Sequence, residues 1–144
     1  MSSIFSAFRI TASALTAQRL RMDVIANNVA NAETTRTAEG GPYRRQQVVF
    51  AAGQAVPQPA SVSAAPTGQG VRVAAILADD TPGTRVYDPS HPDADKDGFV
   101  TYPNVNIVTE MTDMLSATRS YEANVTVFNT LKSMALKALD IGRS

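Results

Sequence analysis

The chain has 144 residues, of which 44% are hydrophobic and 18% charged, and its 13 Lys and Arg balance its 13 Asp and Glu. This length suits one domain with a modest core, and a net charge of zero gives no electrostatic reason to expect nucleic acid or an anionic membrane as a partner. The sequence has no cysteine, which excludes disulfide bonds and thiolate nucleophiles or metal ligands.

Residues 2–31 have the pattern of one long helix. Apolar side chains recur at alternating steps of three and four residues, which is typical of a coiled-coil seam. No Gly or Pro precedes Gly40, and Asn31 is a suitable end because Asn tolerates the left-handed conformation of a helix C-terminus. The predicted seam comprises Met1, Ile4, Phe8, Thr11, Leu15, Gln18, Met22, Ile25 and Val29.

The same segment does not have the pattern of a secretory signal. Arg9, Arg19 and Arg21 interrupt any apolar region within it. Nowhere in the chain do about eighteen apolar residues follow one another, so no segment is predicted to span a bilayer. We therefore expect a different export route if the protein leaves the cytoplasm.

The middle of the chain predicts short strands and a linker. Alternating apolar residues predict strands at 43–50 and 71–77, with shorter candidates at 84–87 and 99–102. Residues 54–70 are rich in Pro, Ala and Ser and carry no charge, which indicates a linker or loop. We expect a small strand-containing lobe here.

Residues 104–141 predict a second long helix with the same seam. Pro103 precedes it, Asn104 or Asn106 can cap it, and Gly142 is a fitting stop. Its early turns carry Glu110 and Asp113, where acidic side chains complement the helix dipole. The predicted seam comprises Ile107, Met111, Met114, Thr118, Tyr121, Val125, Phe128, Lys132, Ala135 and Leu139.

These elements predict a mainly α fold, in which two long terminal helices form a coiled-coil shaft with a β-containing middle insertion. The divisions fall at residues 1–33, 34–102 and 103–144. Both helices also carry apolar residues away from the seam, so each needs cover on more than one face. Leaving these eleven in water would forgo about 15–30 kcal/mol, at roughly 1.5–3 kcal/mol each. They are Phe5, Ile10, Leu20, Val24, Val108, Leu115, Val127, Leu131, Met134, Leu136 and Ile141.

Two arrangements would provide that cover. In one, the strands fold over both helices and form a compact α+β monomer. In the other, further copies or sister subunits cover the helices, and head-to-tail contacts of this kind build helical filaments when the rotation does not close. The second arrangement is the one we favour from the sequence.

One segment partly matches a calcium loop. Asp93, Asp95 and Asp97, followed by Gly98, resemble the opening of an EF-hand loop. Asn104 occupies the position where a bidentate Glu belongs, and the prolines at 89 and 92 exclude the incoming helix. We therefore favour a tight acidic turn, with a calcium-responsive binding module at residues 93–104 as the alternative.

Other candidate sites are weaker still. His91 and Ser90 are sequence neighbours within a Pro-rich turn, which does not predict a catalytic triad. The pair Arg44 and Arg45 is more typical of a solvated strand face than of a nucleic-acid site. The sequence thus predicts no enzyme, cofactor, metal site, nucleic-acid partner or small-molecule substrate.

Three segments, covering about half of the chain, resemble one known family. Residues 25–37 (IANNVANAETTRT) resemble the Asn-rich motif near the N-terminus of flagellar axial proteins, which include rod and hook subunits. The more specific run at 87–115 (YDPSHPDADKDGFVTYPNVNIVTEMTDML) resembles the signature of proximal-rod proteins. Residues 117–143 (ATRSYEANVTVFNTLKSMALKALDIGR) resemble the C-terminal helix of the family.

The resemblance implies a structural subunit of the flagellar basal-body rod, the drive shaft that crosses the periplasm. It implies export by the flagellar type III apparatus without a cleaved signal peptide. The implied partners are other copies, sister rod subunits and the export apparatus, with the surrounding basal-body rings as further candidates. Asn27, Asn28 and Asn31 would then bond exposed backbone, either at the end of their own helix or in a neighbouring subunit.

Overall fold

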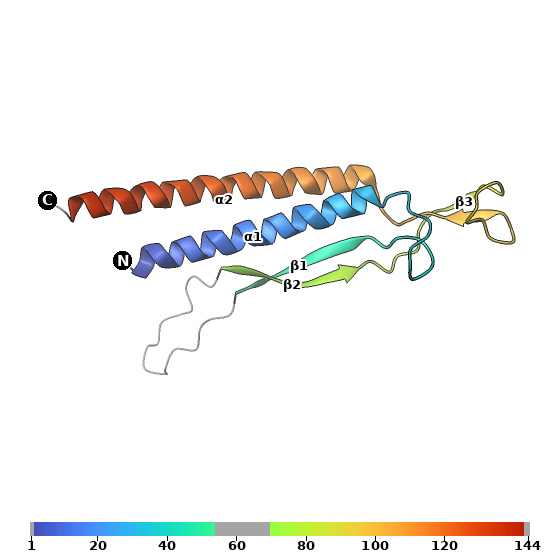
Figure 1. The fold of residues 1–144 in the computed structure, drawn as a ribbon, viewed down its shortest axis with the longest axis horizontal. Coiled ribbons are helices and arrows are strands. Elements are labelled where there is room, and N and C mark those ends of the chain that lie inside the picture. The colour runs from blue at the N-terminus through green and yellow to red at the C-terminus, as the bar shows by residue number, and fades with distance from the viewer. Residues whose placement is uncertain (1, 54–69, 143–144) are drawn as a thin grey trace, which may run out of the picture.

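The fold is an antiparallel pair of long helices with two small strand pairs between them in the sequence (Figure 1). A computed structural model describes residues 2–53 and 70–142. Its mainly α class confirms the prediction, whereas the predicted linker lies outside the described residues except for Gly70. The elements are α1 (Ser2–Ala30), β1 (Gln46–Ala52), β2 (Val71–Ala78), β3 (Arg85–Tyr87), β4 (Phe99–Thr101) and α2 (Ile107–Ile141).

The two helices lie side by side, and both chain ends point the same way (Figure 1). The rings of Phe8 and Phe128 meet edge to face, with centroids 5.1 Å apart. Further along, the Thr118 hydroxyl donates to the Met22 sulfur over 3.7 Å. These contacts fix an antiparallel orientation, which the sequence left open. The 35 residues of α2 span about 52 Å at ~1.5 Å per residue.

On α1 the predicted seam is largely correct, but on α2 every second position is shifted by one residue. The face of α2 toward α1 is formed by Glu110, Met114, Ala117, Tyr121, Asn124, Phe128, Leu131 and Ala135, all buried or half-buried. Of the predicted seam residues, Ile4, Phe8, Leu15, Met22, Met114, Tyr121, Val125 and Phe128 are half-buried, and Ile25 is buried.

Five predicted positions do not lie in the observed contact between the helices. Ile107, Met111, Lys132 and Leu139 are exposed on α2, and Val29 is exposed on α1. In a seven-residue repeat, every second seam position of α2 can be filled by either of two neighbouring residues. Choosing the more apolar of the two selected the residue that does not face α1. Glu110, which is fully buried, lies where Met111 was expected, because other elements compensate its charge.

The β1–β2 hairpin packs on α1. Its strands pair antiparallel with a bulge between Val49 and Phe50, and the backbone N–H of Val71 donates to the Ser13 hydroxyl of α1 over 3.1 Å. Within the described residues the strands contact α1 and not α2. The alternative in which strands cover both helices is therefore wrong: α1 is the middle layer, and the far side of α2 stays open (Figure 1).

The β3–β4 pair forms a small lobe at the end of the molecule away from the termini (Figure 1). Val100 is fully buried, and the rings of Tyr87 and Phe99 pack at 5.3 Å. The tight acidic turn predicted before β4 is present. The Asp95 carboxylate accepts from the backbone N–H groups of Asp97 and Phe99, both over 2.9 Å, and Gly98 has the positive φ of 78° that the turn requires.

Asparagine side chains end one helix and begin the other. The Asn31 amide donates to the carbonyl of Asn27 over 2.9 Å, just past the end of α1, so the prediction of local capping is confirmed. The predicted left-handed backbone is wrong, because no described residue other than Gly has a positive φ. At the start of α2, the Asn106 side chain accepts from the N–H groups of Val108 and Thr109, as predicted.

Candidate functional site

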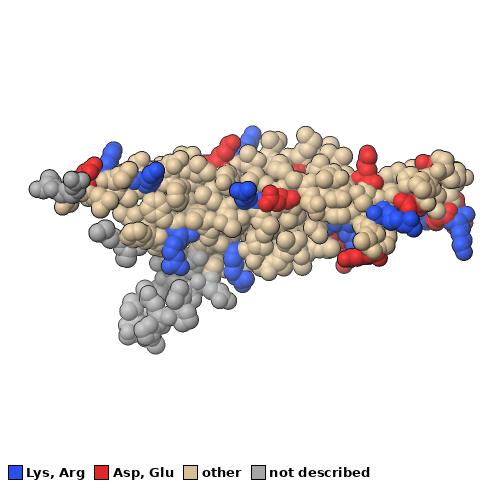
Figure 2. Space-filling view, viewed as in Figure 1, with Lys and Arg blue, Asp and Glu red and all other residues tan. Residues whose placement is uncertain are grey.

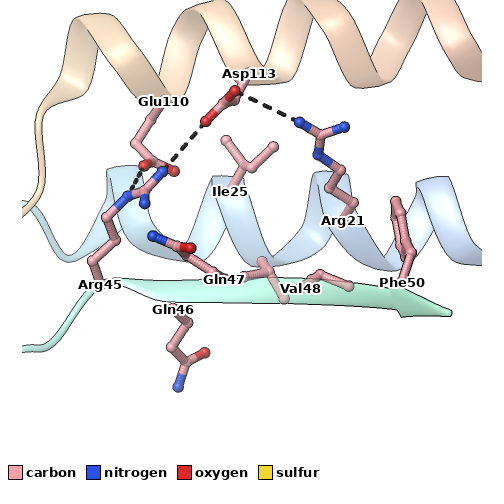
Figure 3. A pocket seen from close by; sticks show the side chains of 10 residues that line it. Arg21, Ile25, Arg45, Gln46, Gln47, Val48, Phe50, Glu110 and Asp113 are labelled. Carbon is pink, nitrogen blue, oxygen red and sulfur yellow. Dashed lines mark hydrogen bonds and ion pairs between the residues drawn. The ribbon is translucent and has the colours of Figure 1, made fainter. Parts of the chain in front are cut away.

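The most unusual feature of the interior is a polar cluster formed by Asn28, Tyr43, Arg45, Glu110 and Asp113. It joins α1, the segment entering β1, and the first turns of α2. Figure 3 shows its charged members, Arg45, Glu110 and Asp113. Glu110 and Asn28 are among the largest fully buried side chains. Since buried polar groups are costly unless they are paired, the bonds of each member determine whether the cluster is tolerated.

Glu110 is satisfied from two sides. Its carboxylate accepts from the Asn28 side-chain amide over 3.0 Å and forms a close ion pair with the Arg45 guanidinium. The same guanidinium reaches Asp113 at 3.3 Å, and Asp113 lies 3.6 Å from Arg21 of α1. Two acidic and two basic side chains thus alternate, and their formal charges cancel.

Asn28 connects the helix pair to β1. Its amide oxygen accepts from the backbone N–H of Gln46 over 2.9 Å, and its amide nitrogen donates to the Gln46 carbonyl over 2.8 Å. The Tyr43 hydroxyl donates to the same Asn28 oxygen over 2.8 Å. Asn28 therefore bonds the backbone of the first residue of β1 and also the buried carboxylate of α2.

The environment of Tyr43 shifts the pKa of its phenol. Burial raises the pKa of its phenol, the hydrogen bond from Asn27 partly offsets that rise, and the negative charge of Glu110 adds to it. The Asn27 amide donates to the Tyr43 oxygen over 3.2 Å. The neutral phenol that donates to Asn28 is thus the favoured form.

Sequence reasoning missed two members of this cluster. Arg45 was expected on a solvated strand face, but it is mostly buried and paired with Glu110, whereas its neighbour Arg44 is exposed and pairs with Asp80. Glu110 was expected only to complement the helix dipole. The available signal was that Arg44 and Arg45 add two charges to a strand whose other side chains are aromatic, apolar or amide-bearing, and this signal did not indicate which Arg is buried.

A groove of about 420 Å³ runs beside the cluster, between β1 and α2 (Figure 3). Its apolar lining comes from Val24, Ile25, Val48 and Phe50. The charged side chains at its margin, Arg21, Arg45, Glu110 and Asp113, are paired with one another. The groove therefore presents apolar surface and no unpaired charge to a neighbour.

Among the described residues, exposed apolar side chains are most numerous on α2. Val108 is 73% exposed and Leu115 is 62% exposed. Figure 2 shows charged side chains in small groups along the helices and more densely at the end that carries β3. This outer surface of α2 comprises Val108, Met111, Leu115, Val127, Met134 and Leu136, with the exposed charged side chains of Arg119, Glu122 and Lys137 among them.

The exposed flank of α1 has a different character. Apart from Phe5 and Val29, it carries charged, polar and small side chains, including Arg9, Thr16, Arg19 and Asp23. The other flank of α1 is covered by the hairpin, where Ile10 and Leu20 are half-buried and Val24 is buried. Of the two helices, α2 therefore has many more exposed apolar side chains in the described part of the chain.

The carboxylates of the calcium-loop alternative are engaged by the protein itself. Asp93 accepts from the Thr35 hydroxyl over 2.8 Å and pairs with Arg36, while Asp95 pairs with Arg85. The backbone N–H of Phe99, with smaller contributions from Asp97 and Arg85, lowers the pKa of Asp95 despite an opposing effect of desolvation. Among the described residues, no group of three His, Asp or Glu side chains is arranged to hold a metal.

The residues of the imagined triad are likewise used locally. The Ser90 hydroxyl donates to Asp88 over 2.6 Å, which is the main reason that the pKa of Asp88 is lowered. The His91 ring accepts from the backbone N–H of Asp93 over 3.1 Å. Ser90 and His91 thus form hydrogen bonds within the turn.

In the described part of the chain, neither helix is apolar enough over a sufficient length to cross a membrane.

Comparisons with known proteins agree with this architecture at both ends of the chain. The family model described as "Flagella basal body rod protein" matches residues 8–36. The model described as "Flagellar basal body rod FlgEFG protein C-terminal" matches residues 96–141. The two matches fall mainly on α1 and α2 and indicate a structural subunit of the flagellar basal-body rod.

Full-length relatives narrow the class. The flagellar basal-body rod protein FlgC of Borreliella burgdorferi is 50% identical, over 96% of this chain and 97% of that protein. The proteins of the same name from Bacillus subtilis and Escherichia coli O6:H1 are 44% and 46% identical, and each match covers at least 96% of both chains. The chain belongs to the FlgC family of flagellar basal-body rod proteins, which places it in the flagellar basal body.

Proposed function

We propose that the protein polymerises through its terminal helices, with other copies and with sister rod subunits, to build the torque-transmitting drive shaft that crosses the periplasm. The observation that carries this proposal is the uncovered outer surface of α2. Within the described residues the hairpin contacts α1 and not α2, and we assign the cover of α2 to another chain. Burying each half-exposed apolar side chain contributes on the order of 1 kcal/mol, and many such contacts along a helix add up to a stable lattice.

The geometry also suits the transmission of torque. No Gly or Pro interrupts either α1 or α2, so neither helix has a built-in kink. The ring contact of Phe8 with Phe128 at one end and the polar cluster at the other hold the helices together. A pair fixed at both ends resists sliding, which is what a shaft requires.

The proposal includes passage through the flagellar type III export apparatus as an unfolded chain, without cleavage of a signal peptide. The segment that a cleaved signal would occupy forms α1, and Phe8 and Leu15 belong to its seam. Removing this segment would take away half of the helix pair. The surrounding basal-body rings are further candidate partners of the middle region, residues 34–102. The proposal assigns no catalysis, cofactor, nucleic acid or small-molecule substrate to the chain.

A matched pair of substitutions tests the proposal. Leu115→Asp places a charge on the outer surface of α2, whereas Ser116→Asp places the same charge on the adjacent exposed residue. Each variant replaces the resident copy in a flagellated cell, and basal bodies are purified and imaged. We expect Leu115→Asp to be exported but excluded from rods, with loss of swimming, and Ser116→Asp to assemble. Normal rods with Leu115→Asp would overturn the role of this surface.

The isolated protein provides a second test. A subunit that needs neighbours should show fast amide exchange in both terminal helices, or should aggregate, when purified alone. A monomer with fully protected helices at low concentration would instead indicate a self-sufficient domain and would contradict the proposal.

A further inference from the structure

The seam between α1 and α2 is repetitive and does not by itself define one alignment. Seven-residue steps on α1 place Phe8, Leu15 and Met22 in equivalent positions. Seven-residue steps on α2 place Met114, Tyr121 and Phe128 in equivalent positions, and all three side chains are half-buried. Sliding one helix past the other by one heptad would again set apolar or aromatic side chains against apolar ones.

The layer that contains Glu110 does not repeat. The next equivalent positions along α2 are Ala117, Asn124 and Leu131, and none of these is charged. A slip of one heptad would move Glu110 about 10 Å along the axis, at ~1.5 Å per residue. Its contacts with Asn28 and Arg45 are hydrogen bonds and cannot survive such a shift.

Neither direction of slip restores the lost partners. In one direction, Glu110 passes the end of α1, which is at Ala30. In the other direction it approaches Arg21, but Arg45 then loses its carboxylate, and it is only 18% exposed. Removing the partner of a buried charge is strongly unfavourable, whichever partner is lost.

We propose that Asn28, Arg45 and Glu110 form a register lock, which selects one alignment of α1 and α2 among those that the apolar seam permits. Buried polar groups that specify register have precedent in coiled coils, where a single buried Asn can fix alignment. Here the lock includes a third element, because Asn28 also bonds both backbone polar groups of Gln46. The side chain of Asn28 therefore fixes both the position of β1 on α1 and the position of α2 along the axis of α1.

The consequence for assembly rests on the proposed function. A slip of one heptad would displace the outer surface of α2 by about two helical turns relative to the hairpin and the groove. Neighbouring copies would then meet a mismatched surface. The lock itself requires no partner, so it can be tested separately from polymerisation.

Disulfide trapping tests the register directly, because the chain has no cysteine of its own. The pair Met22→Cys with Thr118→Cys reports the observed alignment, in which these side chains touch. Met22→Cys with Met111→Cys, or with Val125→Cys, reports a slip of one heptad in either direction. Each pair is introduced into the full chain with an intact lock, and also with Asn28→Leu, Arg45→Met and Glu110→Leu combined.

With the lock intact, we expect the pair at 22 and 118 to oxidise at least about tenfold faster than either slipped pair. With the lock removed, the slipped pairs should form at rates comparable to the first. The matched control removes the exposed pair of Arg44 and Asp80 by Arg44→Met with Asp80→Asn, and it should leave the ratio unchanged. Cross-linking confined to positions 22 and 118 after removal of the lock would overturn the proposal.

Loss of folding would not obscure the result. Glu110→Gln keeps a side chain that can bond Asn28 but removes the charge, so it should shift the ratio only partly and retain helical circular dichroism. If the variant with three substitutions loses that signal, Glu110→Gln decides: an unchanged ratio overturns the lock. Because trapping is intramolecular, failure of rod assembly with a normal ratio would count against the proposed function and not against the lock.

Discussion

The carboxylate of Glu110 lies 3.0 Å from the side-chain amide nitrogen of Asn28, although 82 residues separate the two along the chain. Each side chain is almost completely buried, so the contact joins the two terminal helices in an interior where an unpaired polar group would be destabilising. Arg45 completes the arrangement from the segment that enters β1. Three parts of the chain that are distant in sequence thus depend on one another at a single point.

The buried position of Arg45 predicts a large effect of Arg45→Met. The substitution leaves Glu110 buried without its cation, and breaking a buried pair on one side typically costs about 3–5 kcal/mol. We expect a loss of about 3 kcal/mol in the free energy of unfolding, measured by chemical denaturation and helical circular dichroism. If the isolated chain is only partly helical, the same loss will appear as reduced helix content.

Arg44→Met is the natural control, since Arg44 precedes Arg45 and its pair with Asp80 is largely exposed. Exposed pairs contribute about 0–1 kcal/mol, so this variant should resemble the parent chain. Combining Arg45→Met with Glu110→Met should recover most of the lost stability, because an apolar pair can replace a buried ion pair. Equal effects of the two single Arg substitutions would contradict the assigned burial.

The aromatic contact at the open end of the helix pair predicts a second effect. Phe8→Asp or Phe128→Asp places a carboxylate in the seam, where Phe8 and Phe128 meet at 5.1 Å. We expect either variant to abolish rod assembly and swimming while export continues, measured by motility and by the amount of secreted subunit. Thr16→Asp, on the exposed flank of α1, is the control. Normal swimming of cells with either Phe variant would contradict the proposal that the packed helix pair is needed for rod assembly.

Much of this fold could be predicted from local pattern. The spacing of Phe8, Leu15 and Met22 gave most of the seam of α1 correctly, with Val29 as the exception, because most heptad positions there follow from apolar periodicity. The four predicted strands are present, with shifts of a few residues at their ends. Asn106 caps α2 because its side chain acts within one turn, which is a purely local interaction.

The polar cluster could not be predicted in this way. Periodicity allows either Glu110 or Met111 to face α1, and an apolar count selects Met111. The residue that reverses this choice is Arg45, which lies 65 positions earlier in the chain. Its side chain reaches α2 only after β1 has packed on α1, so the compensation is a tertiary effect that a single sequence does not reveal. The sequence indicated Asn28 as a residue that bonds backbone groups. Its backbone partner, Gln46, lies 18 positions later in the chain and could not be identified from local pattern.

Tyr43 predicts a dependence on alkaline pH. Burial raises the pKa of its phenol above the ordinary value of about 10, so the neutral form is favoured in the folded chain. The corresponding stability is intact below about pH 10 and is lost as the pH rises through the higher folded-state pKa. Tyr43→Phe should cost about 1 kcal/mol at neutral pH, from the lost hydrogen bonds, and should flatten the alkaline decline.

Difference spectra of phenolate absorbance between the parent chain and Tyr43→Phe isolate the titration of this tyrosine from those of the other three. Tyr121→Phe is the control for simple removal of a hydroxyl elsewhere. A Tyr43 phenol that titrates at or below its ordinary value in the folded protein would show that the cluster is more open than the structure has it.

Asp95 predicts the opposite dependence in the β3–β4 lobe. Its carboxylate accepts from the N–H groups of Phe99 and Asp97, and the bond from Phe99 is the main reason that its pKa is lowered. A lowered pKa means that the contribution to stability is present above the unfolded-state value of about 4 and is lost as the pH falls through the folded-state pKa. Amide exchange at Phe99 should therefore quicken below about pH 4, after correction for the intrinsic rate.

Asp95→Ala, which removes the accepting oxygen, should reproduce this loosening at neutral pH, with exchange at Phe99 faster by about threefold or more. Asp97→Ala removes a carboxylate from the same turn but leaves the Asp95 acceptor in place, so it should leave that exchange rate unchanged. Calorimetry with calcium connects the prediction to the alternative use of this loop. Because Asp93 and Asp95 are already paired with Arg36 and Arg85, we expect no saturable binding tighter than about 10⁻⁴ M. Binding above that affinity, abolished by Asp95→Ala, would show that the carboxylates serve an ion and not the turn.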